Sequence, residues 1–131
     1  MGEKNPLRIL MAEDNLINQK VAVKLLNKMG YKPDVVANGL EVLEALERQQ
    51  YDVILMDLQM PEMDGLQSTE EIVKRWHEKS KRPRIIALTA NAMKEDRDRT
   101  IKAGMDDYVS KPINLNAITE ALSKCKPIQQ G

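Results

Sequence analysis

Short apolar runs alternate along the chain with longer segments in which apolar residues recur every three or four positions. Five runs have the length and composition of strands, at residues 7–12, 33–37, 53–57, 85–88 and 107–110. Each run precedes a segment with helical spacing, and no second cluster of strands follows. This order predicts one parallel five-stranded sheet of the α/β class, and right-handed crossovers place helices on both of its faces.

The apolar rows of the helical segments predict which side chains face the core. They are Ile17, Val21, Leu25 and Met29; Leu40, Leu43 and Leu46; Ile72, Val73 and Trp76; a thin row of Met93 and Ile101 in segment 92–103; and Leu115, Ile118, Leu122 and Cys125. Gly30 and Gly104 are expected helix ends. Asn38-Gly39 suggests a hairpin in isolation, but the helical spacing that follows favours a strand-to-helix turn.

Composition limits the classes of partner. The 131 residues, 42% hydrophobic and 31% charged, suit one globular domain. Twenty basic residues balance twenty acidic ones, so charge gives no reason to expect nucleic-acid or membrane binding. The single cysteine suits a reducing compartment, and we expect a cytoplasmic domain whose parent protein can be membrane-anchored. We expect a monomer or a weak dimer.

Polar residues follow the apolar runs where phosphoryl chemistry would need them. Glu13 and Asp14 follow the first run, Asp57 ends the third, Thr89 follows the fourth, and Lys111 follows the fifth. The carboxyl ends of parallel strands meet at one edge of a sheet, which is where such sheets bind ligands. One edge therefore gathers three carboxylates, a hydroxyl and an ammonium group.

Three neighbouring carboxylates require a counter-charge. Two of them about 5 Å apart repel by roughly 3 kcal/mol at an effective dielectric constant near 20. Mg²⁺ offsets such repulsion and prefers oxygen ligands. The spacing suits Glu13 or Asp14, Asp57 and the backbone carbonyl of Gln59. Taken alone, each acid has a simpler reading, since Asp14 could cap a helix.

A carboxylate beside Mg²⁺ can attack a phosphoryl group and become an aspartyl phosphate. The transferring group needs its oxygens neutralised and held in place, and Lys111 and Thr89 have suitable side chains. By itself Lys111 reads as a surface lysine and Thr89 as a helix cap. Only their joint placement supports a catalytic role.

Several motifs together resemble the receiver domains of two-component response regulators. These motifs are Glu13-Asp14-Asn15, Asp57 with the segment 60–65, Thr89-Ala90, and Lys111-Pro112. The resemblance covers residues 7–125, which we expect to form the domain, with a lead at 1–6 and a tail or linker at 126–131. It implies the flavodoxin-like, doubly wound sheet with strand order 2-1-3-4-5.

The resemblance also implies roles for individual residues. Asp57 would be the phosphoacceptor, and Lys111 and Thr89 would contact the phosphoryl group. A cis peptide would join Lys111 to Pro112, and Tyr108 would be the switch aromatic that moves inward with the Thr89 hydroxyl. Phosphorylation would then change the partner affinity of the surface made by the fourth helix, the fifth strand and the fifth helix. Mg²⁺ would be held by these groups: Glu13, Asp14, Asp57 and the carbonyl of Gln59.

The run 13–19 is similar to receivers attached to hybrid histidine kinases. The implied partners are a histidine kinase or a histidine phosphotransfer protein as phosphodonor, and a downstream domain or target protein. The domain alone would assist its own phosphorylation and dephosphorylation without being an enzyme, although a parent chain could be a histidine kinase. The alternative is a stand-alone response regulator.

Two other classes fit less well. A phosphatase of the haloacid dehalogenase type also uses a strand-end Asp with Mg²⁺, but it wants a second Asp two residues later, where this chain has Gln59. A flavodoxin-like cofactor binder lacks its Gly-rich loop here. We expect Cys125 and Met56 to pack in the core, His77 to be exposed, and Gly65 to serve a sharp turn beside the site.

Overall fold

A computed structural model of the chain describes residues 6–90 and 94–125. Five strands alternate with five α-helices and one short 3-10 turn, in the order β1 (Ile9–Ala12), α1 (Leu16–Lys28), β2 (Asp34–Val36), α2 (Gly39–Arg48), β3 (Val53–Asp57), α3 (Gly65–Arg75), η1 (Lys79–Lys81), β4 (Arg84–Thr89), α4 (Lys94–Ala103), β5 (Asp107–Ser110) and α5 (Leu115–Ser123). All strand pairs are parallel and the sheet order is β2-β1-β3-β4-β5. The predicted class and strand order are confirmed.

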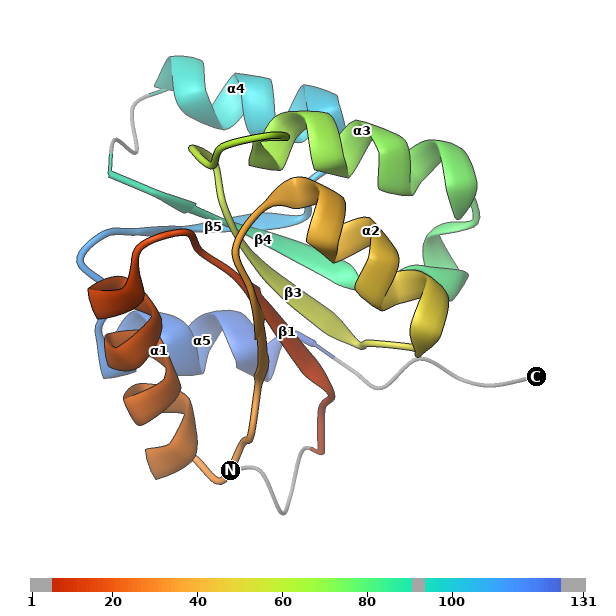
Figure 1. Cartoon of the computed structure of the whole chain (residues 1–131). Coiled ribbons are helices and arrows are strands. Elements are labelled where there is room, and N and C mark those ends of the chain that lie inside the picture. Colours follow the sequence, from red (N-terminus) through yellow and green to blue (C-terminus); the bar gives the residue numbers. More distant parts are fainter. Residues whose placement is uncertain (1–5, 91–93, 126–131) are drawn as a thin grey trace.

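Helices cover both faces of the sheet (Figure 1). Helices α1 and α5 lie on one face, and α2, α3 and α4 lie on the other. Each face has its own buried cluster, one containing Leu26 and Leu122 and the other containing Val42 and Ile72. The central strand β3 is buried along its whole length, as its continuous apolar sequence predicts.

The turns that end the helices follow the sequence signals. Gly30, with φ of 91°, lies just after the C-cap of α1, and Gly104, with φ of 111°, follows α4. Asn38 caps α2 by accepting a hydrogen bond from the backbone N–H of Glu41. The segment Asn38-Gly39 is therefore the strand-to-helix turn that we expected.

The predicted core face of α1 was only partly right. Met29 is buried as predicted, but Ile17 and Val21 are 72% and 46% exposed, and the other residues that pack inward are Ala22 and Leu26. A row of residues four apart drifts by about 40° per step around a helix, so it leaves the buried side within a few turns. The core instead follows the mixed spacing of four and three. Leu16 and Ile17 therefore form an exposed apolar patch at the start of α1.

Three other helical rows need smaller corrections. Leu40 at the start of α2 is 43% exposed, while Leu43 is buried as predicted. Ile101 is exposed, and Thr100 is the buried side chain of that turn of α4, with its hydroxyl donating to the backbone carbonyl of Arg97. Leu115 at the start of α5 is also exposed, while Ile118, Leu122 and Cys125 are buried as predicted. The expected helix start at Ala92, the side chain of Met93 and the tail 126–131 lie outside the described residues.

No helix among the described residues is both long and apolar enough to span a membrane.

Candidate phosphoacceptor and metal site

The predicted polar residues meet at the carboxyl edge of the sheet. Glu13 continues the β1 ladder, since its backbone N–H donates to the carbonyl of Val36 at 3.0 Å. Asp57 and Thr89 are the last residues of the neighbouring strands β3 and β4, and Lys111 directly follows β5. They line one cleft of about 980 Å³ together with Asp14 and Gln59. The parallel sheet therefore brings together residues from four separate segments.

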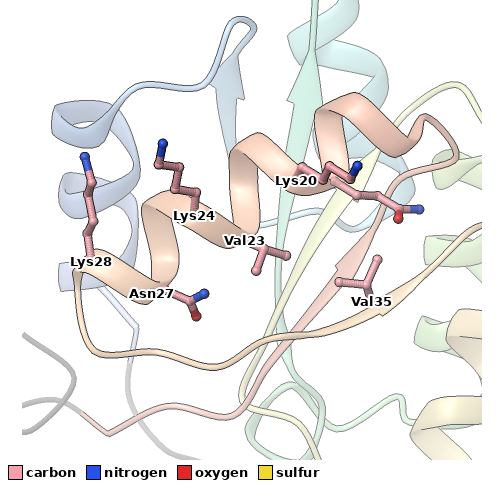
Figure 2. A pocket seen from close by; sticks show the side chains of 7 residues that line it. Lys20, Val23, Lys24, Asn27, Lys28 and Val35 are labelled. Atoms are coloured by element: carbon pink, nitrogen blue, oxygen red, sulfur yellow. The ribbon is translucent and has the colours of Figure 1, made fainter.

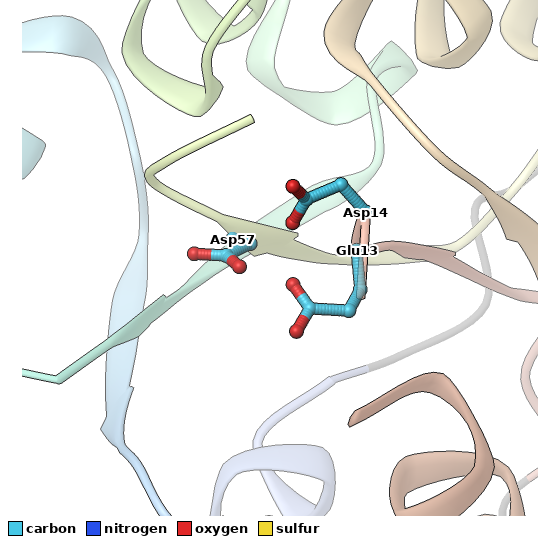
Figure 3. Close-up of side chains that lie close together, drawn as sticks. All are labelled: Glu13, Asp14 and Asp57. Atoms are coloured by element: carbon cyan, nitrogen blue, oxygen red, sulfur yellow. The ribbon is translucent and has the colours of Figure 1, made fainter. Parts of the chain in front are cut away.

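Three carboxylates form the acidic part of this cleft. Oxygen atoms of Glu13, Asp14 and Asp57 lie within 4.8 Å of one another. Figure 3 shows the carboxyl groups of Glu13 and Asp14 pointing toward the side on which Asp57 lies. Glu13 and Asp57 are buried, with exposed fractions of 1% and 6%, and Asp14 is exposed. This geometry suits a hard cation with oxygen ligands that enters from solvent.

Lys111 supplies the cation of the site. Its ammonium nitrogen lies 2.7 Å from Oδ2 of Asp57 and 3.6 Å from Oε1 of Glu13. The backbone N–H of Lys111 donates to the carbonyl of Thr89 at 2.7 Å, which ties the β5 end to the β4 end. The peptide bond between Lys111 and Pro112 is cis, as the family resemblance implied.

Glu13 is a buried acid whose pKa lies well above its ordinary value. Both of its carboxylate oxygens are buried and accept no hydrogen bond within the described part of the chain. Burial, followed by the neighbouring Asp57 carboxylate, raises the pKa of Glu13 to about 7. Asn18 and Lys111 lower this pKa and so offset the shift only in part, and a buried carboxylate that is incompletely compensated is a good ligand for Mg²⁺. The residues present therefore fit the ion that the sequence predicted.

Asn15, and not Asp14, caps α1. The Asn15 side chain accepts hydrogen bonds from the backbone N–H groups of Ile17 and Asn18, at 2.9 and 3.1 Å. The simpler reading of Asp14 as the helix cap is therefore wrong. Its carboxylate remains available to the acidic cluster.

Gly65 allows α3 to begin against the end of β3. A Cβ atom at this position would collide with the backbone carbonyl of Asp57 and lie 3.0 Å from the Met56 side chain. The Gly65 N–H donates to the carbonyl of Leu58 at 3.1 Å, which closes the loop over the site. The expected sharp turn is confirmed, and its cause is a close approach of two backbone segments.

Tyr108 lies half-buried on β5, one strand beyond Thr89. The guanidinium of Arg97 on α4 donates to its hydroxyl at 3.1 Å and lies over its ring, 5.6 Å from the centroid. Its predicted part in a switch concerns a second conformation and stays a prediction. Cys125 and Met56 are buried in the two clusters, and His77 is exposed, as expected.

Sequence reasoning missed three polar neighbours of the site. The side-chain amide of Gln19 donates to the backbone carbonyl of Glu13 at 2.6 Å, and Asn18 and Arg99 line the cleft. Helical spacing could have found the first two, because residues one turn after the α1 cap face back toward the end of β1. Arg99 lies on α4, and its position beside the cleft depends on how α4 packs against the rest of the domain, which the sequence does not show.

Comparison with known proteins defines the class. Residues 9–123 match the response regulator receiver domain family, and the chain belongs to this family. Over 121 residues it is 46% identical to hybrid signal transduction histidine kinase K of Dictyostelium discoideum, covering 88% of this chain and 10% of that protein. Over 118 residues it is 39% identical to the aerobic respiration control sensor protein ArcB of Escherichia coli, covering 90% of this chain and 15% of that protein.

Solved structures give the same result. The receiver domain of a sensor histidine kinase from Pseudomonas aeruginosa, with a magnesium ion coordinated in its active-site cleft, has a TM-score of 0.80 at 42% identity and covers 90% of this chain and 95% of that one. A receiver domain from Saccharomyces cerevisiae, crystallised with a histidine phosphotransfer protein, has a TM-score of 0.81 at 30% identity, covering 89% and 86%. The chain spans between 4% and 16% of the length of the curated relatives compared with it.

Proposed function

We propose that this receiver domain accepts a phosphoryl group on Asp57 from a phosphohistidine of a partner protein. The observation that carries the proposal is the contact of the Asp57 carboxylate with the Lys111 ammonium, within a cluster of three carboxylates. An Asp57 oxygen attacks phosphorus as the P–N bond breaks, and the electron pair of that bond stays on the imidazole nitrogen. The product is an aspartyl phosphate.

The residues of the site would have different roles in phosphoryl transfer. Glu13, Asp14, Asp57 and the carbonyl of Gln59 would hold Mg²⁺, which neutralises charge on the phosphoryl oxygens when bound. Lys111 is already placed to pair with a phosphoryl oxygen on Asp57. Thr89, buried at the end of β4, would donate its hydroxyl to another. The backbone N–H of Gln59, which donates to Oδ1 of Asp57 at 3.2 Å, orients the attacking carboxylate.

The exposed apolar patch on α1 supports docking of a protein donor. Leu16 and Ile17 are 70% and 72% exposed, and their neighbours Asn15 and Asn18 line the cleft. Large apolar side chains that cluster on a surface next to a reaction site mark a contact with another protein. The yeast receiver domain crystallised with a phosphotransfer protein supports the same class of partner for this chain.

We infer further that the domain is the receiver segment of a longer hybrid histidine kinase. Its curated relatives include several proteins with that name, and it matches only a small part of each. The phosphorylated state would then change the surface formed by α4, β5 and α5, to which Tyr108 on β5 belongs. In this role the isolated domain assists its own phosphorylation and dephosphorylation and acts on no other substrate.

Labelling by a small phosphodonor tests the acceptor. The wild-type domain, incubated with acetyl phosphate and Mg²⁺, should gain one phosphoryl group by mass spectrometry, and Asp57→Asn should gain none while its circular dichroism stays unchanged. Asp98→Asn, which alters an exposed acid on α4, should label like the wild type. Full labelling of Asp57→Asn would refute the assignment, and steady turnover of small phosphate esters would favour a phosphatase.

A further inference from the structure

A second hollow lies away from the phosphoacceptor cleft, between α1 and the edge strand β2 (Figure 2). It is a shallow depression of about 590 Å³ that is open to solvent, and its lining includes three lysines of α1 and two valines, one on α1 and one on β2. We call it the α1–β2 groove. Neither the sequence motifs nor the phosphoacceptor role assigns it a purpose.

The groove is strongly basic. Lys20, Lys24 and Lys28 are exposed and lie four residues apart, so successive Cα atoms rise by about 6 Å along the helix. The helix Leu16–Lys28 contains no acidic residue. None of the three lysines pairs with an acidic side chain in residues 6–90 and 94–125. In a chain of zero net charge, this concentrates unpaired positive charge on one helix.

The floor of the groove is apolar. Val23 points from α1 toward Val35 on the edge strand β2, Lys24 and Lys28 extend from α1 away from β2, and Val35 is 36% exposed (Figure 2). The groove residues include no arginine, which binds phosphate through two parallel hydrogen bonds, and no aromatic side chain, which stacks on nucleic-acid bases. Lysines beside valines therefore favour a protein segment that carries carboxylates next to apolar side chains.

The edge of β2 opposes the addition of an extended strand. The Val36 carbonyl accepts from Glu13 on β1, so the outward-facing residues are Pro33, Val35 and Ala37. Pro33 has no N–H, and the N–H of Ala37 donates to Oε1 of Glu41 at 2.6 Å. Only Val35 keeps a backbone donor for a new strand. A helical occupant needs no such donors.

We propose that the α1–β2 groove binds an acidic amphipathic α-helix of a partner protein. Carboxylates four residues apart on that helix repeat at the same spacing, about 6 Å, as Lys20, Lys24 and Lys28. Apolar side chains on the adjacent row pack on Val23 and Val35. Because the charge pairs are exposed, the complex is weak and sensitive to salt. The proposal is independent of the role of Asp57.

Two stapled helical peptides of about 18 residues provide the probe, since unstapled helices of that length are marginal in water. In one, glutamates and leucines occupy adjacent rows with four-residue spacing, and the other has the same composition in shuffled order. Binding to the ¹⁵N-labelled domain is followed by amide shifts at low salt. The ordered peptide should shift Val23 and Val35 and bind the Lys24→Glu variant roughly fivefold more weakly. The matched variant Lys102→Glu, an exposed lysine on α4, should bind like the wild type.

Four results would overturn the proposal. Equal binding of the ordered and shuffled peptides, or equal affinities of the two charge-reversal variants, would show that the lysines act only as diffuse charge. Tighter binding to vesicles containing phosphatidylserine, lost in Lys24→Glu, would assign the groove to a membrane surface. Self-association that Lys24→Glu abolishes would make the occupant a second copy of this chain.

Discussion

The Lys111 ammonium nitrogen lies 2.7 Å from Oδ2 of Asp57, although 54 residues separate the two in the chain. The same nitrogen lies 3.6 Å from Oε1 of Glu13, so one cation serves two buried carboxylates. Lys111 therefore neutralises part of the negative charge of these carboxylates. Its ammonium group lies where it could also contact a phosphoryl oxygen on Asp57.

Replacing this cation should slow phosphorylation. In Lys111→Met the rate of labelling by acetyl phosphate should fall about a hundredfold, because a positioned charge on the transferring group is lost. Mg²⁺ affinity, measured by calorimetry, should rise at the same time, since a competing cation is gone. Lys102→Met on α4 should leave both quantities unchanged. An unaltered labelling rate in Lys111→Met would remove lysine from the mechanism.

The raised pKa of Glu13 makes the site sensitive to pH. Its value of about 7 exceeds the ordinary 4.5, so the folded state holds this proton more tightly than the unfolded state does. For this group, the free energy of unfolding of the metal-free protein is highest below pH 4.5 and falls as the pH rises to about 7. Mg²⁺ competes with the same proton, so its affinity should rise across that range and level off above it.

Two measurements check this pH dependence. Urea denaturation in EDTA follows stability, and calorimetric titration follows Mg²⁺ affinity at each pH. In Glu13→Gln, which carries no titrating proton at this position, the contribution of this group should vanish from both profiles. A wild-type Mg²⁺ affinity that stays constant through the same range would contradict the assignment of Glu13 as a ligand.

Asp14 and Asn15 are adjacent, but their substitutions should affect different properties, Mg²⁺ affinity for Asp14 and stability for Asn15. Asp14→Asn should weaken Mg²⁺ binding with little change in thermal stability, because the cap of α1 is intact. Asn15→Ala should lower the free energy of unfolding by about 1 kcal/mol, because two backbone donors lose their acceptor. Thermal denaturation and Mg²⁺ titration of both variants provide the check. A large stability loss in Asp14→Asn would return that residue to a capping role.

The apolar patch on α1 should matter only to a protein donor. With a phosphorylated histidine phosphotransfer domain as donor, Ile17→Ser should lower kcat/KM about tenfold, since a large apolar contact is lost. Labelling by acetyl phosphate should stay the same. Leu40→Ser, which alters an exposed apolar residue of α2 on the opposite face of the sheet, should change neither rate. If both variants slow the protein donor alike, the patch is not its docking surface.

The sequence predicted the sheet and its acidic edge because both depend on local signals. Continuous apolar runs mark strands buried on both faces, and parallel connections bring their ends to one edge. Asp57 and Lys111 meet for this reason, without any knowledge of side-chain packing. The two strand ends that carry Glu13 and Thr89 follow the same logic.

Helix faces were predicted less well, because a buried face depends on how each helix is rotated against the sheet. Ile17 was assigned to the core by its spacing but lies in solvent, and Ile101 likewise. The N-cap of α1 is Asn15 and not Asp14, because the helix begins at Leu16, one residue later than an Asp14 cap would require. The lysines of the α1–β2 groove had a visible signal, four-residue spacing without acidic neighbours. Their relation to β2 required the fold.

The hydrogen bond from Ala37 to Glu41, together with Pro33, has a consequence for crowded conditions. A sheet with an open outer strand invites neighbouring molecules to continue it into aggregates. Here two of the three outward residues offer no free donor, so sheets of separate molecules cannot readily join along this border. The domain can therefore be concentrated or repeated in tandem with a low tendency to polymerise through β2.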